Sequence, residues 1–208
     1  MIKDFDLLQR ANNDYTTIDL EHAEELAYRE LIDSIRYISL GDECGVMGNI
    51  ANIITYKGRF YIQEEQFDRV FIYDDTGRCL KKIDNKERGP GEYLRIESID
   101  INTEKEELML VDGMSDKLFF YDLDGNFKSI HSIRYFQTEN TLCLRDSVFL
   151  HISAPSQNFG NEGLYGYALV LSKGNENFLK GYRYLPLQVG YKGGGQIFKG
   201  YERSCYHP

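Results

Sequence analysis

The 208-residue sequence contains no tryptophan, only four prolines and four cysteines, and no excess of positive charge. Its 24 lysines and arginines stand against 33 aspartates and glutamates, which gives a net charge of −9. Because nucleic-acid binding depends on clustered Lys and Arg, this balance argues against a nucleic-acid partner. The apolar runs are only a few residues long, and the start MIKDFDLLQR lacks the apolar core of a secretion signal. We therefore expect no transmembrane segment and no signal peptide in this chain.

Cysteine and histidine spacing gives no sign of a metal or redox site. The cysteines lie far apart and form no CxxC pair, at Cys44, Cys79, Cys143 and Cys205. Structural zinc and dithiol redox chemistry are therefore not indicated, and Cys79, within a strand pattern, is expected to be a buried free thiol. The histidines are scattered, at His22, His131, His151 and His207, so we interpret them as structural or surface residues. We expect no metal, no cofactor and no catalytic residue.

Two stretches of the chain repeat one pattern. Residues 58–83 read GRFYIQEEQFDRVFIYDDTGRCLKKI, and residues 106–133 read EELMLVDGMSDKLFFYDLDGNFKSIHSI. An offset of 48 residues separates the matched pairs Ile62 and Leu110, Asp68 and Asp116, Tyr73 and Tyr121, and Gly77 and Gly125. A fixed period of about 40 to 50 residues with several short strands per unit is typical of a β-propeller blade. The 16 tyrosines and 12 phenylalanines suit half-buried strands.

Alternation and turn residues predict four strands in each unit. The first repeat gives strands at 49–56, 59–64, 69–74 and 79–83, and the second gives 99–102, 107–112, 117–122 and 127–133. A third, less regular unit has candidate strands at 141–144, 147–152, 167–172 and 178–184, with a long loop at 153–166. Residues 189–208 begin a partial fourth unit.

The chain divides into an N-terminal segment over residues 1–40 and an incomplete propeller over residues 41–208, with blades near 48–86, 96–134 and 138–186. Helical spacing of apolar residues predicts an amphipathic helix over 19–35, and alternation predicts a lead-in strand over 36–40. A closed propeller needs roughly four to eight blades, whereas Gly48 to Pro208 holds little more than three units of 48 residues. We expect the N-terminal half of a propeller, and possible self-association of the truncated chain through its open edges.

The most specific motif is the connector between the two repeats, RGPGEY at residues 88–93. With the Tyr-Asp-x-x-Gly hairpins and the lead-in at residues 31–40, it resembles an uncharacterised family of six-bladed β-propellers from lipoprotein-rich gut bacteria. The resemblance covers residues 17–135 well and the remainder loosely. It implies an all-β six-bladed ring located in the cell envelope, in the periplasm or as an outer-membrane lipoprotein. The family's signal peptide with a lipid-modified cysteine, and about half of its blades, have no counterpart in this chain.

The connector also has a physical interpretation of its own. Gly89 and Gly91 on either side of Pro90 allow a sharp turn, because proline fixes φ and glycine tolerates positive φ. Arg88, Glu92 and Tyr93 are then held together on one loop. Either Arg88 and Glu92 pair with each other or with loop carbonyls and fasten adjacent blades, or the three side chains form a binding site on the rim of the channel.

Repeated acidic residues allow the same two interpretations. Asp68 and Asp116 recur before a strand, where an aspartate usually bonds to backbone groups of the turn, and a ring of ligands around the channel is the alternative. The hairpin from Asp122 does not fit a calcium loop, because its glycine comes fourth and position twelve is Ile133. Gly77 and Gly125 are therefore interpreted as turn residues.

Other motifs indicate little chemistry. The run of glycines at 193–195 lacks the ending of a phosphate-binding loop, and no Gly-x-Ser-x-Gly sequence is present. The many C-terminal tyrosines suit strand packing, with stacking on sugars as the alternative. We interpret the chain as a non-enzymatic binding or protein-interaction module with a protein or carbohydrate ligand. A glycan or peptide lyase or hydrolase with a site at the channel mouth, and an inactive truncated product, are the alternatives.

Overall fold

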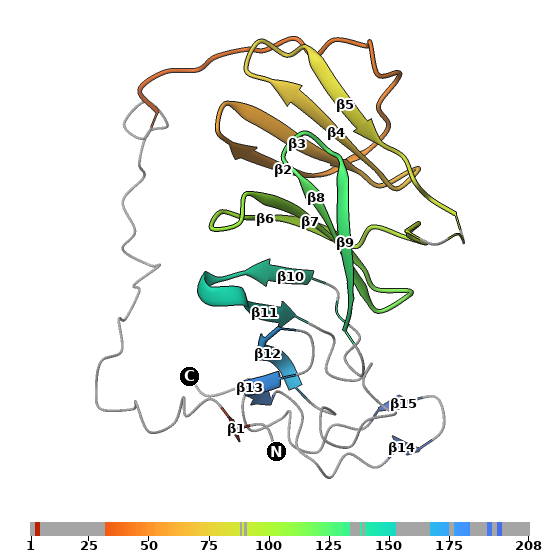
Figure 1. The fold of residues 1–208 in the computed structure, drawn as a ribbon, viewed down its shortest axis with the longest axis vertical. Helices are drawn as coiled ribbons and strands as arrows, with labels where there is room; N and C mark the ends of the chain where they lie inside the picture. Colours follow the sequence, from red (N-terminus) through yellow and green to blue (C-terminus); the bar gives the residue numbers. More distant parts are fainter. Residues whose placement is uncertain are drawn as a thin grey trace.

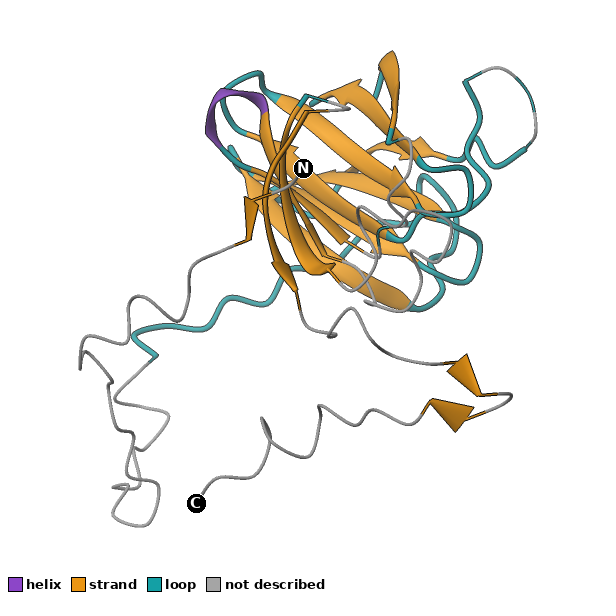
Figure 2. Ribbon diagram, turned by 90° about the horizontal axis from the view of Figure 1, so that it is seen from below, coloured by secondary structure: helices purple, strands orange, loops and turns teal. Residues whose placement is uncertain are grey.

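The computed structural model describes residues 3–4, 32–87, 89, 91–133, 138, 140–152, 167–174, 177–183, 191–192 and 195–196. Within these residues the fold is all-β, and the only helical segment is the short 3-10 turn η1 (Arg145–Ser147). Figure 2 shows this turn at the margin of the body of strands. No helix in the described part of the chain is long and apolar enough to cross a membrane.

Three successive antiparallel sheets form the fold (Figure 1). The first contains β2 (Ile50–Tyr56), β3 (Arg59–Glu64), β4 (Arg69–Asp74) and β5 (Cys79–Ile83), and the second contains β6 (Ser98–Asn102), β7 (Glu107–Asp112), β8 (Lys117–Asp122) and β9 (Phe127–Ser132). The third contains β10 (Asn140–Cys143), β11 (Val148–Ile152), β12 (Tyr167–Lys173) and β13 (Asn177–Arg183), with β1 (Lys3–Asp4) parallel to β13 at its edge. A separate pair joins β14 (Tyr191–Lys192) to β15 (Gly195–Gln196).

Each of the three sheets is a meander in which strands pair in chain order, and the sheets stack one after another (Figure 1). This is the arrangement of consecutive propeller blades. The twelve strands predicted for these sheets agree with the observed ones to within one residue at each end. The prediction succeeds because turn residues bound short apolar and aromatic runs, whose alternate residues pack on opposite sides of the sheet, as Leu110 and Met109 do.

The two repeats occupy equivalent places in successive sheets, as predicted. Ile62 pairs with Phe71 in the first sheet, and Leu110 pairs with Phe119 in the second. The offset of 48 residues does not extend to the first strand of each sheet: Ile53 pairs with Ile62, whereas Ile99, 46 residues later, pairs with Leu110. The turn between β6 and β7 has two more residues than the turn between β2 and β3, which accounts for the difference.

The core lies between the sheets. Tyr61, Val70 and Ile72 of the first sheet pack with Leu110 and Phe119 of the second. Burying each such side chain contributes about 1.5 to 3 kcal/mol. A second cluster joins the second and third sheets, with Met109, Phe120, Phe149 and Val170 among its members.

The N-terminal predictions need correction. Arg36 to Leu40 form no strand, because the segment lies against the turn between β4 and β5 and not beside a strand edge among the described residues. Arg36 Nη2 donates to the Asp75 carbonyl at 2.8 Å, and the adjoining Gly41 amide donates to the Gly77 carbonyl at 2.7 Å. Residues 32–35 are not helical, and the rest of the predicted helix lies outside the described residues. We call residues 36–47 the lead-in strap.

The prediction of a free thiol at Cys79 is wrong. Cys79 forms a disulfide with Cys44, whose Cα lies 6.0 Å away, and the two are separated by 35 residues in sequence. The lead-in strap brings Cys44 onto the outermost strand β5, a proximity that no local pattern reveals. Cys44 and Met47 also pack on Ile62, Phe71 and Tyr73, so the lead-in strap covers part of the outer face of the first sheet.

Candidate functional site

The connector after β5 folds back on itself before it enters the second sheet. Lys86 and Tyr93 form a parallel bridge, and the Tyr93 amide donates to the Asn85 carbonyl at 3.1 Å. The turn between them has a hydrogen bond from the Glu92 amide to the Gly89 carbonyl at 3.2 Å, and Gly91 has a φ of 88°. Arg88 and Pro90 lie outside the described residues.

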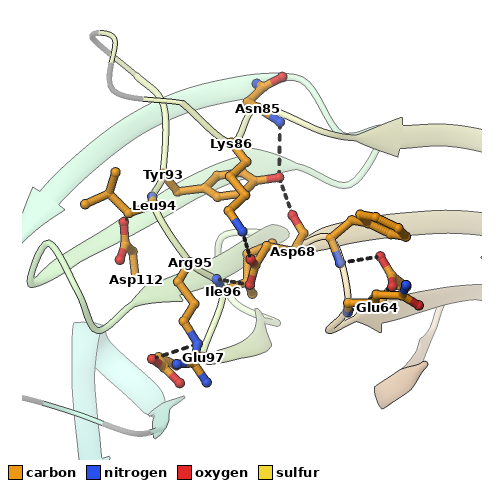
Figure 3. Close-up of polar contacts among 12 residues, drawn as sticks. Glu64, Asp68, Asn85, Lys86, Tyr93, Leu94, Arg95, Ile96, Glu97 and Asp112 are labelled. Atoms are coloured by element: carbon orange, nitrogen blue, oxygen red, sulfur yellow. Dashed lines mark hydrogen bonds and ion pairs between the residues drawn. The ribbon is translucent and has the colours of Figure 1, made fainter. Parts of the chain in front are cut away.

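Tyr93 lies at the centre of this connector and is fully buried (Figure 3). Its hydroxyl donates to the Asp68 carbonyl at 2.8 Å and accepts a hydrogen bond from the Asn85 amide at 3.1 Å. Its ring meets the edge of Phe119 in the second sheet, with ring centroids 6.0 Å apart. Burial raises the pKa of the Tyr93 hydroxyl far above its ordinary value, so this group stays neutral. Its role is to hold the connector in place, not to exchange a proton with a ligand.

Asp68 links the first sheet to the connector through its carboxylate (Figure 3). It has a φ of 55° in the turn between β3 and β4, its Oδ1 accepts from the Ile96 amide at 3.1 Å, and its Oδ2 pairs with Lys86. The amide of Leu94, two residues before Ile96 in the connector, donates to Asp112 Oδ2 at 2.8 Å. Alternate amides of the connector thus bond to carboxylates of two different sheets, which fastens the sheets together at this end.

The other predicted binding residues have separate surroundings. The Glu92 carboxylate accepts from the Gly89 amide within the connector turn. Asp116 has the same place in its sheet as Asp68 and a similar φ of 52°, but its carbonyl accepts from the Ile133 amide at 2.7 Å. Burial and the nearby charge of Asp112 raise the pKa of Asp116. The structure brings Asp68, Glu92 and Tyr93 onto or against one connector and leaves Asp116 in the next sheet.

The glycine turns of the two repeats are alike. Gly77 and Gly125 have φ values of 88° and 81°, and their amides donate to the carbonyls of Asp74 and Asp122 at 3.1 and 3.0 Å. The Asp74 and Asp122 carboxylates accept from backbone amides in the same turns. The Thr76 hydroxyl, with these amides, lowers the pKa of Asp74 to about 2. In the described residues, no group of three or more His, Cys, Asp or Glu side chains is placed to hold a metal ion.

A cleft of about 200 Å³ opens beside Asp68, where the turn between β3 and β4 meets the end of the connector. Its polar lining consists of Gln63, Glu65, Asp68, Arg95 and Glu97. Gln63 is buried and its Nε2 donates to the Ile96 carbonyl at 3.0 Å, which holds the two walls together. Arg95 and Glu97 form an ion pair at 3.3 Å at its mouth (Figure 3), with more than half of the Arg95 side chain exposed. Three carboxylates and one guanidinium therefore line this cleft.

A larger hollow of about 440 Å³ lies near the hairpin turns at the other ends of these strands. Its charged side chains are already paired, Lys57 with Glu106 and Arg59 with Asp124. Arg59 Nη1 also donates to the Leu123 carbonyl at 2.8 Å, and Asp122 accepts from the backbone of its own turn. A ligand here would have to displace both ion pairs, whereas in the cleft beside Asp68 the exposed Glu65 carboxylate forms no ion pair with a described residue, so that cleft is the better candidate.

Comparison with known sequences assigns the chain to a family. The family model described as "Domain of unknown function (DUF4934)" matches residues 15–205. The chain belongs to this family. Among proteins with curated descriptions, none matches it significantly.

Solved structures resemble this DUF4934 chain in fold. A "Putative exported protein" from Bacteroides fragilis superposes with a TM-score of 0.65 at 19% sequence identity, over 76% of this chain and 44% of that one. A member of the DUF4221 family from Bacteroides vulgatus has a TM-score of 0.43 at 11% identity, over 68% of this chain and 44% of that one. The DUF4934 chain therefore spans less than half the length of these two structures.

The DUF4934 chain also contains a buried polar network in the third sheet that the sequence did not reveal. His151 Nδ1 lies 2.9 Å from Thr141 Oγ1, and His151 Nε2 lies 2.8 Å from Ser172 Oγ. Because the Ser172 hydroxyl donates to the Gly174 carbonyl at 3.0 Å, it accepts from Nε2–H, and the neutral imidazole then accepts from Thr141. Burial lowers the pKa of His151 to about 4. The cleft residues Gln63, Glu65, Arg95 and Glu97 were likewise missed, because they come from two segments about 30 residues apart.

Proposed function

We propose that this chain is a non-enzymatic binding module of the bacterial cell envelope, part of a six-bladed propeller, and that the cleft beside Asp68 receives a basic side chain of a partner protein. The observation that carries the proposal is the composition of this cleft: Glu65, Asp68 and Glu97 face a single guanidinium, that of Arg95. A Lys or Arg side chain entering the cleft could pair with Glu65 and Glu97 at its rim.

Size and charge favour a single side chain as the occupant. The cleft of about 200 Å³ is smaller than the roughly 300 to 1,000 Å³ of a pocket that encloses a whole small molecule. The net charge of −9 attracts basic partners at long range, because summed surface charge steers association. Asp68 itself is held by Lys86 and the Ile96 amide, so it supports the cleft floor. Glu65 is exposed, and Glu97 would exchange its ion pair with Arg95 for one with the entering side chain.

Two observations support an envelope location. The disulfide between Cys44 and Cys79 is of a kind that persists in oxidising compartments such as the bacterial periplasm. The Bacteroides fragilis protein with the similar fold is described as exported. Fractionation of the producing cells, followed by thiol labelling without reductant, tests this part: a protein found in the cytosol with both thiols reduced contradicts it.

Binding is tested with an immobilised lysine-rich peptide, an acidic peptide of equal length and a panel of neutral oligosaccharides. We expect saturable binding to the lysine-rich peptide that weakens as salt is raised. The double variant Glu65→Gln/Glu97→Gln should lose at least about tenfold in affinity, which corresponds to about 1.4 kcal/mol. A control with the same change in charge, Asp42→Asn/Asp75→Asn, alters exposed carboxylates outside the cleft and should bind normally.

The outcomes separate the alternatives. Equal loss in both double variants would mean that net charge, not the cleft, binds the peptide. Binding confined to an oligosaccharide would identify a carbohydrate ligand, and conversion of an oligosaccharide or peptide to product would identify an enzyme.

A further inference from the structure

The backbone on both sides of Arg95 is fixed, whereas its side chain can move. The connector amides before and after Arg95 donate to the carboxylates of Asp112 and Asp68, at 2.8 and 3.1 Å (Figure 3). The Arg95 side chain is 58% exposed, and its Nε lies 3.3 Å from Glu97 Oε1. An exposed ion pair of this kind is weak, because water solvates both partners. The Arg95 guanidinium can therefore leave Glu97 at little cost while its Cα stays at the mouth of the cleft.

Glu97 has less freedom than Arg95. Its side chain is 25% exposed and lies over Gly113, where an added Cβ would be 2.8 Å from Glu97 Cγ. The Glu97 amide also donates to the Val111 carbonyl at 2.8 Å. Glu97 therefore keeps its carboxylate at the cleft, and a cation that enters displaces the Arg95 guanidinium rather than the Glu97 carboxylate.

The charges of the cleft are close to balanced. Lys86 pairs with Asp68 and Arg95 pairs with Glu97, so each of these carboxylates already has a cationic partner. Glu65 is exposed and forms no ion pair with a described residue. The cleft therefore lacks one positive charge, and a single basic side chain neutralises it.

We propose that Arg95 sets the selectivity of the cleft, which accepts one basic side chain and excludes a second one from the same partner. This inference rests on the proposed function, the entry of a basic side chain beside Asp68. When that side chain pairs with Glu65 and Glu97, the fixed backbone keeps the released Arg95 guanidinium at the mouth of the cleft. A second cation then meets this like charge and no further cleft carboxylate, because Asp68 stays paired with Lys86. The partner segment thus presents an isolated Lys or Arg, not a pair of them.

The test compares the affinities of two peptides for the full chain at about 0.15 M salt, where exposed charges are screened beyond about 8 Å. Both peptides are Gly-Ser sequences of equal length with blocked ends. One carries a single lysine and the other carries Lys-Ser-Lys, because side chains two residues apart in an extended peptide share a face. The parent should bind the two-lysine peptide at most about twofold more tightly, since either lysine can enter. In Arg95→Gln this preference should rise by about fivefold, the gain of one further exposed ion pair.

Arg78→Gln is the matched control. Arg78 is likewise exposed, its Nε lies 3.1 Å from Asp74 Oδ2, and it lies outside the cleft. The control changes the net charge by the same amount as Arg95→Gln and should keep the preference of the parent. The proposal is overturned if the preference rises equally in both variants, if it is unchanged in Arg95→Gln, or if the parent already prefers the two-lysine peptide by about fivefold. Failure of the proposed function is distinct: neither the parent nor Arg95→Gln then binds either peptide, which overturns both.

Discussion

Acidification should destabilise the fold through one buried imidazole. His151 is 2% exposed, its two ring nitrogens meet Thr141 and Ser172, and burial lowers its pKa from 6.5 to about 4. In the unfolded chain the same imidazole titrates near 6.5. Below that pH the unfolded state binds a proton that the folded state does not, so the free energy of unfolding falls as the pH is lowered.

The size of the effect follows from the shift. One pKa unit corresponds to 1.36 kcal/mol, so His151 should reduce the free energy of unfolding by about 3 kcal/mol between pH 7 and pH 4. Most of the loss should occur between pH 6.5 and pH 4, the window between the unfolded and folded values. Protonation of Nδ1 would reverse the hydrogen bond with Thr141, whose hydroxyl lies 3.2 Å from Thr138 Oγ1 and can donate there, so the cost comes from burying the charged imidazolium.

Urea unfolding followed by circular dichroism at a series of pH values measures this slope. His151→Gln is the comparison, because the amide keeps a donor and an acceptor but does not titrate, and the carboxylates of both proteins contribute equally. Between pH 7 and pH 4, the free energy of unfolding of the parent should fall by about 3 kcal/mol more than that of His151→Gln. Equal slopes, or an NMR titration that places the His151 pKa near 6.5, would refute the reasoning.

Three further predictions concern the connector and the lead-in strap. Gly91→Val should cost about 1 to 3 kcal/mol, because the φ of 88° strains a β-branched residue although the space around it is open; an unchanged melting temperature would contradict this. Tyr93→Phe should cost about 1 to 3 kcal/mol in urea unfolding, because the Asn85 amide and the Asp68 carbonyl lose their buried partner; a neutral result would mean that water replaces the hydroxyl. Cys44→Ser/Cys79→Ser should cost about 3 to 4 kcal/mol, as expected for a cross-link that closes a loop of 35 residues; equal melting of the parent with and without reductant would argue against it.

The sequence was sufficient to predict the strands and their order. The apolar run in 107–112 follows from the packing of this strand between two sheets, and Gly77 and Gly125 mark turns because their backbone has positive φ. The prediction of a lead-in strand was wrong, because a sequence pattern does not show whether a neighbouring strand is present. Residues 36–40 alternate, but they meet a turn rather than a strand, and alternation alone does not identify the neighbour.

Contacts between segments distant in sequence were not predictable. Cys44 reaches Cys79 only because the lead-in strap crosses the outer face of the first sheet, and Cys79 therefore looked like a buried thiol of a strand. The cleft has a similar origin: Glu65 belongs to a turn of the first sheet, whereas Arg95 and Glu97 belong to the connector. A propensity argument treats each segment alone, so it cannot show that their charges converge.

Asp68 and Asp116 show that the repeated sequence determines the fold, whereas residues outside the repeat determine the candidate site. Asp68 and Asp116 share a place in their sheets and a positive φ, which is a property of the repeat. Their contacts differ, since Asp68 holds Lys86 and the Ile96 amide of the connector, while the Asp116 carbonyl holds the Ile133 amide. The repeated sequence therefore determines the backbone conformation at both aspartates, and the connector after the first sheet determines the contacts of the Asp68 carboxylate. Because Arg95 and Glu97 lie on that connector and outside the repeated pattern, changes there can alter the cleft without disturbing the stacking of the sheets.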